Sequence, residues 1–159
     1  MYLEFDFLKL WIEVDDLGIT AIHYVDAPLK EPDLTDSMKK HLDLAKKELT
    51  AYFNGKPIQF TVPLHLTVGT DFQKNVWRAL IDVPYGEIRN YQEIAQAVNS
   101  PKAQQAVGQA NKKNPIPIII PCHRVTAKNG TLGGYMGNST NGALIKEFLL
   151  NLEHKTYSK

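Results

Sequence analysis

Hydrophobic and polar positions alternate near the start of the chain and then change to helical spacing. Residues 3–7 alternate apolar with acidic side chains, which is the two-residue period of a strand. Residues 15–18 read Asp-Asp-Leu-Gly, a turn signal, and residues 19–25 follow as a returning strand. Residues 35–53 have the period of an amphipathic helix, with lysines on the polar face. Its apolar stripe contains Met38, Leu42, Ala45, Leu49 and Tyr52.

A break after this helix divides the chain. Asn54 and Gly55 end the helix, and residues 56–68, which contain two prolines, are predicted to be extended. The division predicts a strand-rich N-terminal domain, residues 1–67, and a second domain, residues 68–159.

Helix-start signals dominate the second domain. Thr70 is followed by Gln73 at the third helical position, which is a capping box, and this helix is predicted to end before Pro84. Asn90, with Glu93 three positions later, predicts the cap of a short second helix.

A further helix is predicted at about residues 102–111, with Ser100 as its cap and Pro101 at its first position. A short helix, a tight turn and a second helix form a helix-turn-helix candidate. Residues 115–125 are predicted to be extended and residues 126–142 to form a loop rich in Gly and Asn. A last helix, residues 141–154, is predicted to bury Leu144, Phe148 and Leu152.

These elements predict an α+β fold. The first domain is of α/β type with a small antiparallel sheet, and the second is mostly helical, with the helix-turn-helix and an extended segment that carries the single cysteine.

Composition narrows the class of protein. Apolar residues make up 43% and charged residues 22%, as in ordinary soluble globular proteins. No window approaches about 18 consecutive apolar residues, and acidic residues near the N-terminus argue against a signal peptide. A single cysteine cannot form an internal disulfide, which fits the cytoplasm. No metal is predicted, because no ligand spacing connects the remaining histidines, His23, His41, His65 and His154.

Charge is unevenly distributed although the net charge is only +1. Residues 1–67 hold 7 Lys and Arg against 11 Asp and Glu, a net of −4, whereas residues 68–159 hold 11 against 6, a net of +5. Between residues 89 and 128, Glu93 is the single acid among six basic residues. Such a cluster is typical of a nucleic-acid face, but chance clustering on a solvated surface gives the same count, and strong binders are usually more basic.

The stretch IPIIIPCHRV, residues 116–125, holds the single thiol beside a base. A lone cysteine after isoleucines is more often a buried apolar residue than a nucleophile. Against that reading, Pro121 ends the strand, so that Cys122 lies at a rigid turn. His123 with a later carboxylate, for which Glu153 is a candidate, can generate the reactive thiolate. Both interpretations remain open on these residues alone.

The segment KAQQAVGQAN, residues 102–111, is rich in small side chains. One explanation is close packing against another helix. The other is close approach to a nucleic-acid backbone, since a helix of small residues suits the narrow minor groove and reads little sequence there.

Several motifs together resemble one family, the O(6)-alkylguanine-DNA alkyltransferases, which are the methylated-DNA–protein-cysteine methyltransferases of direct DNA repair. PCHRV is preceded by NPIPIII, with YQEIAQAV and PKAQQAVGQANKKNP upstream. The resemblance runs from about Gly69 to Glu153 and includes GTDFQKNVWRAL, VPYGEIRNY and GGYMG. The N-terminal half is similar only in its pattern of strands and a helix.

The resemblance implies a reaction that occurs once per molecule. The protein would bind duplex DNA through the minor groove and flip the damaged base into a pocket. Cys122 would take the alkyl group from a guanine oxygen, or a thymine oxygen, and the thioether product has no good leaving group for a second step. His123 would accept the thiol proton through a water, and Glu153 would orient the imidazole. No cofactor is needed, because the alkyl group is already activated on an aromatic ether.

The resemblance also implies roles for further residues. Tyr91 would donate a hydrogen bond toward the base and Asn114 would shape the cysteine turn. The base pocket would contain Val125, Tyr135 and Met136. The DNA-binding residues would be Lys102, Ala103, Gln104, Gln105, Ala106, Gly108 and Arg124. The expected partner is double-stranded DNA containing alkylated guanine, bound by a monomer.

Two departures from the family pattern leave room for other functions. The family usually has an arginine where this chain has Gln105, and glutamine lacks its phosphate and cation–π attraction. We therefore expect weaker base flipping. The alternative function is recognition of alkylated DNA with weak or no repair. The presence of Cys122 argues against this alternative. A thiol hydrolase using Cys122 and His123 lacks an oxyanion-hole motif. The loop after Gly137 is longer than expected, which is predicted to alter the preferred alkyl group.

Overall fold

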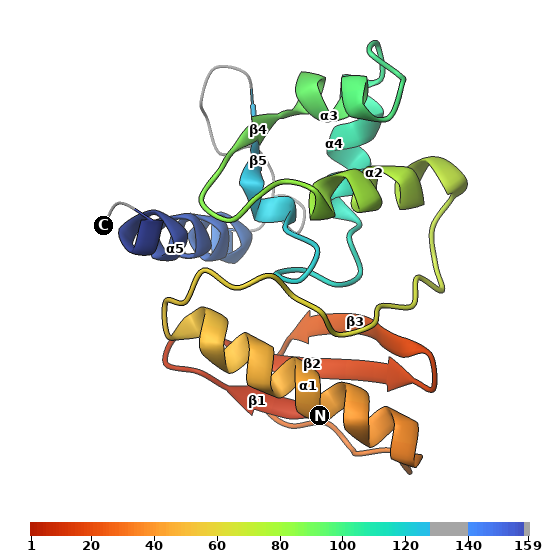
Figure 1. Ribbon diagram of the computed structural model, residues 1–159, viewed down its shortest axis with the longest axis vertical. Coiled ribbons are helices and arrows are strands. Elements are labelled where there is room, and N and C mark those ends of the chain that lie inside the picture. The colour runs from red at the N-terminus through yellow and green to blue at the C-terminus, as the bar shows by residue number, and fades with distance from the viewer. Residues whose placement is uncertain (128–139, 158–159) are drawn as a thin grey trace.

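The computed structural model describes residues 1–127 and 140–157 of the 159-residue chain, and Figure 1 shows two layers. The N-terminal layer consists of β1 (Tyr2–Glu4), β2 (Lys9–Asp15), β3 (Gly18–Tyr24) and α1 (Asp36–Phe53). The C-terminal layer contains α2 (Asp71–Ile81), β4 (Arg89–Asn90), α3 (Tyr91–Ala97), α4 (Gln104–Lys112), the 3-10 turn η1 (Cys122–Arg124), β5 (Val125–Thr126) and α5 (Thr140–Tyr157). This is the α+β class that the sequence predicts.

The sheet of the N-terminal layer is an antiparallel meander in the order β1-β2-β3. The predicted turn between β2 and β3 is present, and the Asp15 carboxylate accepts hydrogen bonds from the backbone N–H groups of Leu17 and Gly18. The alternating pattern of residues 3–7 is only partly a strand, because β1 ends at Glu4 and the Phe7 side chain is 75% exposed.

Helix α1 lies across the sheet, as Figure 1 shows. It begins where the sequence predicts, because the Thr35 hydroxyl accepts a hydrogen bond from the Met38 N–H. The predicted stripe is turned inward, with Leu42, Ala45, Leu49 and Tyr52 buried. Burial of this stripe against the sheet is the main force that holds α1 in place.

Both predicted helix caps form in the C-terminal layer, and each is a capping box. Thr70 and Gln73 exchange hydrogen bonds at the start of α2, and Asn90 and Glu93 do so at the start of α3. The buried Trp77 of α2 donates its indole N–H to the Ala110 carbonyl of α4 over 2.8 Å. This bond fixes α4 against the rest of the layer.

The predicted start of α4 is wrong. Ser100 and Pro101 belong to the turn before the helix, and α4 begins at Gln104 after Ala103, which provides no side-chain cap. The physical reason is that Asn99 has a left-handed conformation, with φ 61°, so that the chain reverses and needs the next residues to cross from α3 to α4. The order of short helix, turn and second helix is as predicted.

The predicted extended segment at residues 115–125 is also wrong in its middle. Ile118 has φ 75°, a conformation that a β-branched residue rarely adopts, and the Ile120 N–H donates to the Ile116 carbonyl over 2.9 Å. The isoleucines therefore form a buried, tightly bent loop rather than a strand. Only Val125–Thr126 is extended, where β5 pairs in parallel with β4.

Helix α5 buries the predicted face only in part, because Phe148 and Leu152 are half-buried against the core but Leu144 is not. Leu144 is 59% exposed, whereas Lys146, Leu149, Leu150 and Glu153 are buried. The polar pair decides the orientation of the helix, because Lys146 and Glu153 each form hydrogen bonds inside the molecule. None of the helices in the described ranges is long and apolar enough to cross a membrane.

Candidate active site

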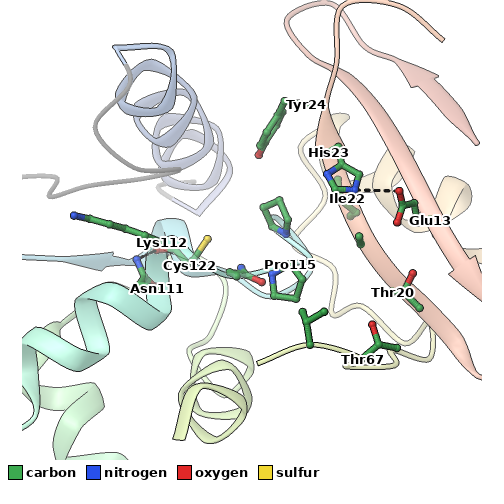
Figure 2. Close-up of a pocket in the computed structure, with 14 residues that line it drawn as sticks. Glu13, Thr20, Ile22, His23, Tyr24, Thr67, Asn111, Lys112, Pro115 and Cys122 are labelled. Atoms are coloured by element: carbon green, nitrogen blue, oxygen red, sulfur yellow. Dashed lines mark hydrogen bonds and ion pairs between the residues drawn. The ribbon is translucent and has the colours of Figure 1, made fainter. Parts of the chain in front are cut away.

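The thiol of Cys122 lies at the beginning of η1, directly after Pro121, and is 2% exposed. Cys122 and β3 line a common cavity of about 540 Å³ between the two layers. Figure 2 shows the sulfur facing this space, with His23 and Tyr24 of β3 on the other side. This volume lies within the range of small-molecule sites, so the cavity offers room for one compact reacting group beside the thiol.

His123, the residue after Cys122, forms a buried pair with Glu153 of α5. His123 Nε2 lies 2.5 Å from Glu153 Oε2, and both residues are fully buried. The other ring nitrogen, Nδ1, is buried and has no hydrogen-bond partner among the described residues. The carboxylate therefore favours the tautomer with its proton on Nε2, which leaves Nδ1 as the basic nitrogen.

Charge states in this pair follow from the surroundings. Burial alone would raise the pKa of Glu153, but the hydrogen bond and charge of His123, followed by those of Arg124, hold that pKa far below its usual range. Burial lowers the pKa of His123 below its usual value despite the opposing effect of Glu153. At neutral pH the site thus contains a carboxylate and a neutral imidazole, which is the protonation state of a general base.

Two asparagines hold the cysteine turn in place. Asn114 donates to the Ile120 carbonyl over 2.8 Å and accepts from the Ile116 N–H over 2.9 Å. Asn111, at the end of α4 and 2% exposed, donates to the Cys122 carbonyl over 3.2 Å. Asn111 was not predicted from the sequence, although an asparagine on the inner face of a helix of small residues is a signal that could have identified it.

Tyr91 is the first residue of α3 and is half-buried. Burial raises the pKa of its hydroxyl, and Cys122 raises it further when its thiol is ionised. The hydroxyl therefore stays protonated at neutral pH and can donate a hydrogen bond to a group that enters the site.

The outer face of α4 carries short or neutral side chains. Gln104, Gln105 and Ala106 are exposed and Gly108 is half-buried. A Cβ atom added at Gly108 would meet nothing within 4 Å. Close packing inside the molecule therefore does not explain the glycine.

Comparisons with known proteins support one family along nearly the whole chain. Residues 71–155 match the DNA-binding domain of 6-O-methylguanine DNA methyltransferase, and residues 2–66 match the ribonuclease-like domain of the same protein. The chain belongs to this methyltransferase family.

Relatives in this family are similar over most of their length. The constitutive methylated-DNA–protein-cysteine methyltransferase of Bacillus subtilis is 53% identical over 115 residues, which cover 72% of this chain and 67% of that protein. The methylated-DNA–protein-cysteine methyltransferase of Methanosarcina acetivorans is 45% identical over 141 residues, 87% of each chain. The crystal structure of Mycobacterium tuberculosis OGT in complex with DNA has a TM-score of 0.83 and 38% identity, covering 98% of this chain and 92% of that one.

One DNA-binding residue expected from the family resemblance needs correction. Arg124 is 7% exposed and donates to both carboxylate oxygens of Glu153 and to the Val83 carbonyl. Its guanidinium is occupied inside the protein because a buried arginine requires a buried counter-charge. Arg124 is therefore part of the Glu153 network, while Lys102 at the start of the α4 region is exposed.

The expected base-pocket residues are described only in part. Val125 is fully buried in β5, and its carbonyl accepts a hydrogen bond from Lys146 Nζ over 2.5 Å. Tyr135 and Met136 lie outside the described residues. Lys146 was not predicted, and burial lowers its pKa to about 8. In the described ranges, no group of His, Cys, Asp and Glu side chains is suited to a metal ion.

Proposed function

We propose that this methyltransferase-family protein repairs alkylated DNA by transferring the alkyl group from the guanine oxygen, and from the thymine oxygen, to Cys122. The observation that carries the proposal is the single thiol at a pinned turn, followed in the chain by a neutral imidazole paired with a carboxylate. The names of the relatives and the neighbour solved with DNA support the same reaction.

The proposed chemistry is a direct displacement. His123 Nδ1 accepts the thiol proton through a water, and the carboxylate of Glu153 stabilises the imidazolium that results. The Cys122 sulfur then forms a bond to the alkyl carbon while the carbon–oxygen bond breaks, and the electron pair leaves with the guanine. The Tyr91 hydroxyl donates toward the departing base. The product is a thioether, so each molecule reacts once.

The proposed DNA-binding surface is the exposed face of α4. Ala103, Ala106 and Gly108 would allow the helix to approach the minor groove, while Lys102 would supply positive charge near the phosphates. Gln104 and Gln105 would lie close to the flipped nucleotide, and Gln105 would occupy the gap that it leaves. Flipping a base costs a few kcal/mol, and the cost is smallest for a poorly paired base.

The proposal also covers the oligomeric state, the cellular location and the domains of the protein. We propose a monomer that acts in the cytoplasm, with residues 1–67 as a structural domain and residues 68–159 as the domain for DNA binding and alkyl transfer. The alternative function, recognition without repair, is not favoured, because the similar proteins are named as methyltransferases and Cys122 is present.

An intact-mass experiment tests the function. The protein is incubated with a duplex oligonucleotide that contains O(6)-methylguanine, and its mass is measured. A single methyl adduct that is absent in Cys122→Ser is the expected result. Tight binding of the oligonucleotide without any change in mass would overturn the proposal in favour of recognition alone.

A further inference from the structure

Tyr52 is a buried titratable residue that the proposed reaction does not yet use. It lies near the end of α1, is fully buried, and donates its hydroxyl to Glu153 Oε2 over 2.5 Å. Figure 1 shows that this end of α1 lies on the side of α5, which carries Glu153. Through Tyr52, the N-terminal layer thus contacts the pair formed by His123 and Glu153.

The hydroxyl competes with the imidazole for one oxygen. His123 Nε2 and the Tyr52 hydroxyl are each 2.5 Å from Glu153 Oε2 and 3.4 Å from one another. The second carboxylate oxygen accepts from Arg124 Nε over 2.9 Å and from the Gly86 N–H over 3.2 Å. A carboxylate held by donors on both oxygens cannot rotate freely, and each donor takes up part of its charge.

Burial, followed by the charge of Glu153, raises the pKa of Tyr52 well above its usual value. The phenol therefore remains a donor at every pH at which the protein would act. The edge-on ring of Tyr85, 6.0 Å away between centroids, and that of Phe53, 5.3 Å away, restrict the orientation of the Tyr52 ring.

We propose that Tyr52 is a positioning residue for alkyl transfer, which fixes the orientation of the Glu153 carboxylate and limits how much of its charge His123 receives. The inference rests on the proposed function, since His123 is the base only if Cys122 is the nucleophile. Without the hydroxyl, more of the carboxylate charge would be directed at the imidazole. The imidazolium would become more stable, and His123 would remain protonated to a higher pH.

Other charged or titratable groups influence this site and must be kept constant. They are Arg124 and Cys122 of η1, Lys146 and Glu153 of α5, and Tyr85 before β4. The change Tyr52→Phe alters none of them. A matched control is Leu49→Val, one turn earlier on the same buried face of α1, which loosens the packing but removes no hydrogen bond.

The first test is the rate of methyl transfer from an O(6)-methylguanine duplex, measured in single turnovers between pH 4 and pH 9. In Tyr52→Phe the acid limb of the rate–pH profile is expected to move up by about one unit, a tenfold change in the proton affinity of His123. Leu49→Val should keep the wild-type midpoint even where its rate is lower. An unchanged midpoint in Tyr52→Phe would overturn the inference.

The second test needs no DNA and therefore separates this inference from the proposed function. NMR titration of the His123 imidazole, assigned with His123→Gln, should give a higher midpoint in Tyr52→Phe than in the wild type. If Tyr52→Phe does not fold, the wild-type protein labelled with ¹³C-tyrosine answers the question. The Tyr52 ring resonance should then shift at the same midpoint as His123, and a resonance unaffected by that titration would count against the coupling.

Discussion

Glu153 and the outer face of α4 belong to the same layer but differ in almost every physical respect. Glu153 is fully buried and accepts hydrogen bonds from Tyr52, Gly86, His123 and Arg124. The exposed face of α4 presents amide, methyl and hydrogen groups, and Gly108 has open space where a side chain would be. The proposed site of thiol activation thus has many hydrogen-bond partners, whereas the proposed contact surface has only small or neutral side chains.

This difference predicts opposite responses to mutation. Removing one partner from a buried polar network leaves the others unpaired in a medium of low dielectric constant, which affects both stability and chemistry. Changing a side chain on the exposed face should leave the fold intact and alter only what binds there. Four experiments test this difference, in order of decreasing expected effect.

The largest effect is expected for Glu153→Gln. The amide cannot stabilise an imidazolium, so the rate of methyl transfer should fall by about 10²–10⁴-fold, the range that acid–base catalysis contributes. Because Arg124 would lose its buried counter-charge, the free energy of unfolding should fall by about 3–5 kcal/mol. Single-turnover rates and urea unfolding measure the two effects. Glu147→Gln, which changes an exposed acid on the same helix, should alter neither, and an active, stable Glu153→Gln would contradict the role of the network.

Acid should weaken the wild-type fold in two stages. The pKa values of His123 and Glu153 are both lower in the folded protein, so the unfolded chain binds more protons and stability falls as pH falls. The loss should begin below about pH 6.5, where unfolded histidine titrates, and should steepen below about pH 4.3, where unfolded glutamate does. Urea unfolding at pH 7.5, 5.5 and 3.5 gives the curve. Stability that is constant across this range would show that the pair is not coupled to folding.

The variant Gly108→Ala tests whether the glycine is needed for packing inside the protein or for close approach of α4 to DNA. With nothing within 4 Å of the new methyl group, alanine should stabilise α4 by up to about 1 kcal/mol through its higher helix propensity. Binding to duplex DNA should nevertheless weaken, because the methyl group keeps the helix from the groove. Thermal unfolding and a fluorescence anisotropy titration measure these opposite changes. A loss of stability with unchanged DNA binding would restore the packing explanation.

The smallest effect is expected for Gln105→Arg. A guanidinium beside the flipped nucleotide should add about 0.5–1 kcal/mol of attraction and speed repair of a methylated duplex severalfold. Gln104→Arg, which adds the same charge at the neighbouring exposed position, is the matched control. If both variants gain equally in single-turnover rate, the benefit is general charge attraction, and no gain in either would mean that Gln105 does not limit flipping.

Local signals in the sequence predicted the elements that depend on local forces. The capping boxes at Thr70 and Asn90 and the buried stripe of α1 formed as predicted, because each depends on residues three or four positions apart. The bend at Ile118 was not predicted, since isoleucine strongly disfavours positive φ and adopts it only where surrounding contacts impose it. Asn114 is one such contact; the family resemblance implied that it shapes the cysteine turn, but its hydrogen bonds to Ile116 and Ile120 are seen only in the structure.

The sequence also did not predict polar contacts between residues that are far apart in the chain. The helical period predicted the buried stripe that contains Tyr52. It did not predict the hydrogen bond from Tyr52 to Glu153, because these residues are 101 positions apart. Similarly, the family resemblance placed Arg124 at the DNA, but its side chain is buried. Lys146 and Glu153 are also buried on α5, although both are charged residues, since their hydrogen-bond partners lie inside the protein.

The bond between Asn111 and the Cys122 carbonyl spans eleven positions, and Asn114 fastens two points between its ends. Because hydrogen bonds hold this stretch at both ends and in the middle, its residues can be substituted but its length cannot change. Among relatives, insertions and deletions should therefore avoid residues 112–121 even where the identities of those residues drift. For protein engineering, this stretch is unsuitable for tags or grafted loops, because one added residue would move the thiol relative to the helix proposed to face DNA.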